Sequence, residues 1–296
     1  MRYAIVLLAA LFHAAPAHAQ HEHETVASPA SLNPETIREL DAVRAAVARY
    51  EDHAAAVADG YRHLGRDRVP GNALMGEHWF VPGGSREPLD LERPSTLIYA
   101  TIDGEKRLVG LAWSVFRRPG DPMPEGFTGE ADRWHVHHVD RMAAARALGR
   151  PFLERIVERR RERGKLGAGD GRTELTMLHA WIGLENPAGA FANDNVALPY
   201  ARLGLPLEWA DPDDPAAARG VGLLVEACGD RAAPACQDAA SRVRAALEET
   251  RSGMIEPAAF NAAASDAWRD YRMAALASLT PEQRARLEAL RSATTH

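Results

Sequence analysis

Histidine residues stand in three segments of this sequence whose other residues are mostly apolar or aromatic. His135 and His137 lie in WHVHHV, His179 lies in LTMLHAW, and His78 lies in MGEHWF. A β-strand turns every second side chain to the same face, so His135 and His137 can reach one ion although their Cβ atoms are ~7 Å apart. An apolar setting disfavours a charged imidazole and favours the neutral ring that binds metals. The pattern therefore predicts a transition-metal site formed by these four histidines.

Imidazole ligands suit zinc, copper, nickel or ferrous iron, and they make calcium and magnesium poor occupants. Of these ions we expect zinc or copper. Glu77 and His138 are substitute ligands, since each adjoins one of the four histidines. Met75 and Met177 could add sulfur for copper, although methionine more often fills a core. Scattered histidines that each make separate hydrogen bonds, or a metal-free catalytic use, are the alternatives.

Glutamate near the histidines supports a second hypothesis, a metal-dependent hydrolase or lyase. In such an enzyme Glu77 or Glu185 would act as general base on a metal-bound water, whose pKa can fall to ~7. The sequence contains no HExxH zinc-protease motif, no GxSxG serine motif and no phosphate-binding glycine loop between a strand and a helix. Catalysis is therefore an open alternative to metal binding alone.

The N-terminal residues have the three parts of a secretory signal peptide. Arg2 supplies the positive charge, and residues 4–15 form an apolar core too short to cross ~30 Å of hydrocarbon. Ala17-His18-Ala19 is a small-x-small cleavage site. We expect cleavage before Gln20 and a periplasmic or secreted protein. An uncleaved anchor is the alternative.

Cys228 and Cys236 stand eight residues apart between segments of helical character. An oxidising compartment favours a disulfide across the turn between the two helix ends. A redox pair or a metal-thiolate pair is the alternative, but the spacing is not CxxC and no histidine adjoins it. We therefore expect a structural disulfide.

A long helix and several strands must position these side chains. Asn33-Pro34-Glu35 is a helix start, and apolar residues at every third or fourth position predict one amphipathic helix that ends near Gly60. Asp103-Gly104 is typical of a type I′ turn and predicts a hairpin of the residues on either side. The expected strands are 97–102, 105–116, 133–140 and 173–183, and the expected ordered loops are 65–95 and 184–206. From Pro215 to the end the sequence predicts three alanine-rich helical stretches and no strand.

The fold class that we expect is α+β, with a long N-terminal helix packed on a small antiparallel sheet and a C-terminal helical segment after it. The expected organisation is a signal peptide (1–19), a flexible N-terminal tail (20–32), a histidine-bearing α+β domain (33–210) and a helical C-terminal segment (211–296).

Composition limits the classes of protein and partner. Of the 296 residues 46% are apolar and 26% charged, which is a globular mixture and not a disordered one. A net charge of −6 argues against a nucleic-acid partner. No later stretch approaches 18 apolar residues, so we expect no membrane span after signal cleavage. Protein partners are not indicated.

Several strings carry a resemblance to known proteins. MGEHW, WHVH, LHAW and NPAGAF together resemble a group of uncharacterised exported bacterial proteins, over about residues 35–205. No activity is assigned to that group, so the resemblance implies export and no reaction. Separately, Leu279-Thr280-Pro281-Glu282-Gln283 begins a helix with a capping box and is similar to the short motif of small periplasmic stress chaperones. It supports a third hypothesis, a helical stress or chaperone-like interaction module.

Overall fold

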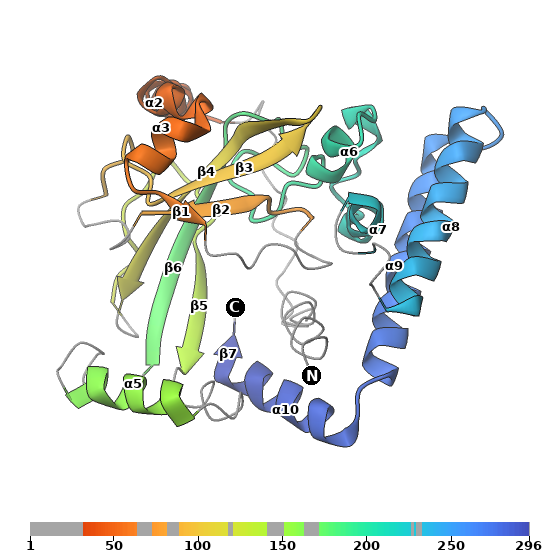
Figure 1. Cartoon of the computed structure of the whole chain (residues 1–296). Helices are drawn as coiled ribbons and strands as arrows, with labels where there is room; N and C mark the ends of the chain where they lie inside the picture. The colour runs from red at the N-terminus through yellow and green to blue at the C-terminus, as the bar shows by residue number, and fades with distance from the viewer. Residues whose placement is uncertain are drawn as a thin grey trace.

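The computed structural model of the chain describes residues 32–63, 73–81, 89–117, 121–140, 151–162, 172–225, 228 and 233–295 (Figure 1). Helices and antiparallel strands both contribute, which confirms the α+β class. The expected signal peptide and residues 20–31 of the expected tail lie outside the described residues.

Seven strands of the described residues form one sheet in the order β1-β2-β3-β4-β6-β5-β7, and neighbouring strands are antiparallel. The sheet is strongly twisted, so that β2 and β3 run across the direction of β5 and β6 (Figure 1). The strands are β1 (Arg62–His63), β2 (Glu77–Phe80), β3 (Thr96–Ile102), β4 (Glu105–Arg117), β5 (His135–Asp140), β6 (Arg172–Trp181) and β7 (Thr294–Thr295). Because β6 lies between β4 and β5, the strands that carry His179 and His135 are neighbours.

The hairpin of β3 and β4 is confirmed. Asp103 has a φ of 53° and Gly104 a φ of 80°, so both turn residues have left-handed backbone. A type I′ turn requires this conformation at both positions, and Asp-Gly provides it at low cost. The short turn therefore fixes the register of β3 against β4 where the two strands leave it, with Ile102 opposite Glu105.

The two faces of the sheet belong to different apolar clusters. One face contributes Leu97, Leu111 and Trp113 to a cluster that includes Leu40 and Val43 from the N-terminal helices. The other face contributes a smaller cluster with α6 (Leu198–Arg202), and its buried members are Ile98, Ala100, Ile102, Val109, Trp181 and Leu198. The second face is the one that continues toward the histidines.

The single long N-terminal helix was a wrong prediction. The segment forms α2 (Pro34–Val47), a 3-10 turn η2 (Ala48–Glu51) and α3 (His53–Ala58). Asp52 has an extended backbone and accepts a hydrogen bond from Ala54 N at 2.9 Å, so it caps α3. An Asp side chain competes for backbone N–H groups in this way, and it breaks a pattern that is otherwise continuous.

The expected loop 65–95 also differs from the structure, because it contains β2. Glu77–Phe80 pairs with β3, and His78 lies opposite Ile98. The strand is only four residues long, and Gly76 precedes it with a φ of 65°. So short a strand gives too few alternating residues to be separated from a loop by pattern alone.

The described part of the chain after residue 214 contains four helices, where we expected three helical stretches. They are α7 (Pro215–Val225), α8 (Pro234–Arg251), α9 (Pro257–Ala277) and α10 (Pro281–Ala293), and a 3-10 turn, η3 (Leu207–Trp209), precedes them. The remaining described helix is α5 (Pro151–Glu162). The largest apolar cluster joins α7, α8 and α9 to Leu74 and Tyr200, so it includes residues on both sides of the predicted boundary at 210.

The chain end returns to the sheet. Helix α10 lies along the bottom of Figure 1 and leads to β7, whose Thr294 and Thr295 pair with Val139 and His138 of β5. We expected no strand in this region.

The capping box of α10 is confirmed, because Thr280 N donates to Gln283 Oε1 (2.8 Å) and Gln283 N donates to Thr280 Oγ1 (3.2 Å). In the described part of the chain no helix is both long and apolar enough to cross a membrane.

Cys228 and Cys236 form the expected disulfide, with their Cα atoms 5.3 Å apart. It joins the start of α8 to the chain that follows α7.

We expect Cys228→Ser with Cys236→Ser to lower the free energy of unfolding by about 2 kcal/mol, because the bond closes a short loop. Chemical denaturation of the oxidised protein and of the double variant measures the difference. Equal midpoints would contradict a stabilising role.

Candidate histidine site

Three predicted ligands lie on one face of the sheet, the face of Ile98 and Trp181. His179 stands opposite Ala112, which stands opposite Thr96. His78 stands opposite Ile98 in the next row. His135 stands opposite Met177, two residues from His179. Since side chains alternate along a strand, His78, His135 and His179 all project from this face.

The rings of these histidines are close together. The centroids of His78 and His179 are 5.8 Å apart, and those of His135 and His179 are 5.1 Å apart. Strands β2 and β6 are three places apart in the sheet, which for a flat sheet would separate them by about 14 Å. The twist and the small residues Gly110 and Ala112 between them allow the two side chains to approach each other.

His179 is the centre of the group and is fully buried. Its Nδ1 lies 2.9 Å from the carbonyl oxygen of Asn193. A carbonyl oxygen can only accept a hydrogen bond, so Nδ1 carries the hydrogen and the lone pair of the neutral ring is on Nε2. Metal-binding histidines characteristically use one nitrogen in this way and bind with the other.

A loop built from residues 184–197 holds the Asn193 carbonyl in place. Trp181 donates through its backbone N to Ala190 O (2.8 Å) and through Nε1 to Ala192 O (2.7 Å). Asn186 Nδ2 donates to Asp194 O at 2.9 Å, directly after Asn193. These bonds fasten both sides of the loop, so the His179 ring has a fixed orientation.

No protein-family model, no curated protein and no solved structure matches the chain. The interpretation of the site therefore depends on its own chemistry.

The three histidines do not form a complete ligand set as they stand. Among the described residues, no group of three or more His, Cys, Asp or Glu side chains is placed to hold a metal ion. Two imidazoles that bind one tetrahedral ion at ~2.0–2.1 Å have ring centroids about 5 Å apart. The His135–His179 pair matches this spacing, and the His78–His179 pair exceeds it by less than 1 Å.

Other predicted residues are placed less favourably or not described. His137 and His138 pair with Leu175 and Glu174 through their backbones, and their side chains lie outside the described residues. Glu185 is exposed. Glu77 precedes His78 in β2, so its side chain projects from the opposite face.

Lys106 engages the Glu77 carboxylate on that opposite face. Burial alone would raise the pKa of Glu77, but the hydrogen bond and the charge of Lys106 outweigh burial and hold the pKa below its usual value. Trp79 Nε1 also donates to this carboxylate. A carboxylate held in this manner is a poor general base for chemistry at the histidines.

Two buried hydroxyl groups share the histidine face, and the sequence analysis missed both. Thr96 and Ser114 are 0% and 5% exposed, and their Oγ atoms have no hydrogen-bond partner among the residues that the structure describes. Thr96 lies in the row of His179, and Ser114 lies opposite Met177. A buried hydroxyl needs a partner, so a bound water or anion beside the histidines would satisfy both. Serine and threonine are common in strands, and nothing in their spacing distinguishes these two.

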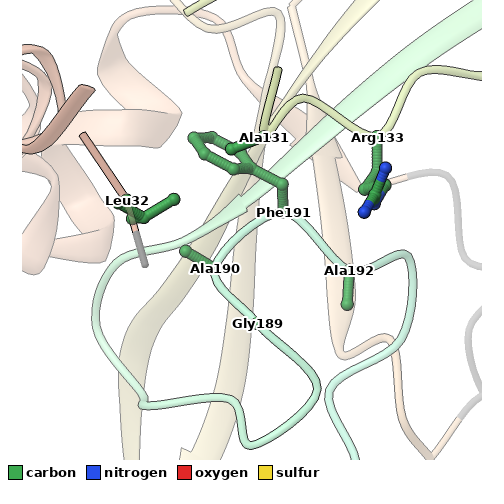
Figure 2. A pocket seen from close by; sticks show the side chains of 7 residues that line it. All are labelled: Leu32, Ala131, Arg133, Gly189, Ala190, Phe191 and Ala192. Carbon is green, nitrogen blue, oxygen red and sulfur yellow. The ribbon is translucent and has the colours of Figure 1, made fainter. Parts of the chain in front are cut away.

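Two hollows elsewhere in the described chain are less suited to chemistry. One of about 10 Å³, room for a single water, is lined by part of the loop that holds His179, residues 189–192, and by Leu32, Ala131 and Arg133 (Figure 2). Another of about 340 Å³ lies between α8 and α9, where Arg242 pairs with Asp238 and Asp270. Both carboxylates pair with Arg242, so each charged group that lines this hollow already has a partner within it.

Asp132, three residues before His135, has an unusual protonation. Burial raises the pKa of Asp132 to about 7, the charge of Glu39 adds to the increase, and the hydrogen bond from Phe127 N opposes it. The carboxyl group is therefore protonated in the folded protein at pH values where the unfolded chain is ionised. This cost is absent below pH ~4 and grows as the pH rises toward 7.

Asp132→Asn removes this cost and keeps the acceptor for Phe127 N. We expect the variant to raise the free energy of unfolding by about 2 kcal/mol at pH 8, with solvent screening allowed for, and to have no effect below pH 4. Thermal unfolding across this pH range measures the difference. An equal effect at both ends of the range would show that the charge of Asp132 is not the cause.

Proposed function

We propose that this protein binds one transition-metal ion, zinc or copper, through His78, His135 and His179, and that it does so after export to the periplasm. The spacing of the two rings about His179 is the observation that carries the proposal. Closure of the site needs only a small movement of the His78 ring, since the other pair already has the separation that a shared ion requires. His137, two residues from His135 in the same strand, is the expected fourth ligand.

The residues around the three histidines favour metal binding alone over metal-dependent catalysis. Glu77 belongs to the opposite face with Lys106, and Glu185 is exposed, so neither supplies a free carboxylate beside the rings. The chaperone-like alternative requires an apolar stripe on the C-terminal helices. Among the described residues after 214, the large apolar side chains that are exposed are Met254 and Met273, which lie on different elements.

Elemental analysis of protein purified from the periplasm tests the proposal. We expect about one zinc or copper ion per chain in the wild type, and loss of that ion in the double variant His135→Ala with His137→Ala. His53→Ala is the matched control, because His53 contacts Trp79 and Tyr99 on the opposite face. If the wild type and the double variant hold the same small amount of metal, the proposal is wrong.

A further inference from the structure

We infer that the ion for which this site is built is copper(I), and that the thioether of Met177 is one of its ligands. This inference rests on the proposed function, since it names the ion and adds a ligand to the same site. The inference has three requirements. Met177 must lie beside the histidines, its side chain must do more than fill the core, and its thioether sulfur must favour binding of copper(I) over zinc.

Met177 is adjacent to both of the two closest histidines, His135 and His179. It is directly opposite His135 in the pairing of β5 with β6. Directly opposite residues on one face have Cβ atoms about 5 Å apart. Met177 also precedes His179 by two residues in β6, so it projects from the same face as that ring. A flexible side chain at this position can bring its sulfur to an ion held by the two imidazoles.

The two residues that pair with Met177 across the neighbouring strands are polar, His135 and Ser114. Met177 is 7% exposed, yet in the part of the chain that the structure describes it belongs to none of the apolar clusters. Its other cross-strand neighbour is Ser114, whose hydroxyl is buried. By contrast, the adjacent Leu178 is a fully buried member of the cluster on the opposite face. Met177 is thus a buried soft donor with polar neighbours.

The donor types then select the ion. A thioether is a soft ligand that suits copper(I) and contributes little to zinc, and imidazole suits both ions. His135, His179 and Met177 are all uncharged donors, which match a monovalent cation. The one predicted carboxylate ligand, Glu77, is held by Lys106 on the other face.

Competition with bicinchoninate under anaerobic conditions measures the copper(I) affinity of the full exported chain, and a zinc dye measures its zinc affinity. We expect Met177→Leu, which conserves volume, to weaken copper(I) binding at least tenfold and to leave zinc binding within twofold. Met273→Leu is the matched control, because Met273 is 71% exposed. X-ray absorption of the copper-loaded wild type should show sulfur in the first shell, and the Met177→Leu variant should lack it.

The outcomes separate the two proposals. Copper(I) affinity unchanged in Met177→Leu, or a wild-type first shell of nitrogen alone, overturns the role of Met177 and leaves metal binding intact. Absence of both ions from the wild type overturns metal binding and the inference together. Should Met177→Leu fail to fold, the first shell of the wild-type copper complex decides the question.

Discussion

Replacing His179 with glutamine is expected to lower zinc or copper affinity by at least about 100-fold. His179 is the ring that both His78 and His135 approach, so its loss removes both of these ring pairs. Loss of a residue that only orients a ligand already costs about 10–100-fold, and removal of the central ligand should cost more. Glutamine is close in size to histidine, which limits the cavity that the change creates. Chelator competition measures the affinity.

His53→Gln provides the control for this experiment. His53 is also a histidine, but it begins helix α3 and packs against Trp79 with ring centroids 4.2 Å apart. We expect its variant to retain wild-type affinity. Equal losses in both variants would mean that the metal depends on overall stability, and unchanged affinity in His179→Gln would exclude the site.

The second large effect concerns the contact of α7 with α9. A Cβ atom on Gly220 would lie 2.0 Å from the backbone oxygen of Ala264. Backbone cannot move aside as a flexible side chain can, so Gly220→Ala must push the two helices apart. We expect a loss of about 3 kcal/mol in the free energy of unfolding, although alanine is the better helix former. Thermal and urea unfolding measure the loss.

Gly253→Ala is the comparison for Gly220. Gly253 has a φ of 74° but has nothing within 4 Å of an added Cβ, so it reports backbone strain without a clash. We expect its cost to be about 1 kcal/mol. If the two variants lose the same stability, close helix contact is not the reason that residue 220 is glycine.

Locally encoded features of the fold were predictable from the sequence. Asp103-Gly104 specifies its turn within two residues, and Thr280 with Gln283 caps α10 within four. The cysteine pair is likewise a local feature, because only eight residues separate the partners. In each case the determining residues lie close together in the chain.

Features that depend on distant contacts were not predictable in this way. The cap formed by Asp52 divides a helix whose apolar period continues across the break. Strand β2 exists as a strand because it pairs with β3. Strand β6 follows β5 in the chain but lies between β4 and β5 in the sheet, and this order depends on contacts between distant segments. Pattern analysis detects periodicity within a segment and contains no information about which strand is its neighbour.

The candidate site shows the same division. Alternation within a strand places His179 and Met177 on one face, and the sequence indicates this directly. The approach of His78 to His179 depends on sheet twist and on the small residues of β4, and the bond from His179 to Asn193 involves a backbone carbonyl. A backbone carbonyl is common to every residue, so no residue type marks its role.

Anomalous diffraction from crystals of the metal-loaded protein would locate the ion directly. We expect one strong peak on the sheet face of Trp181, within about 2.1 Å of Nε2 of His179 and of a ring nitrogen of His135, with His78 drawn in to the same ion. A peak elsewhere, or metal-soaked crystals with no peak between these rings, would show that the histidines do not share an ion.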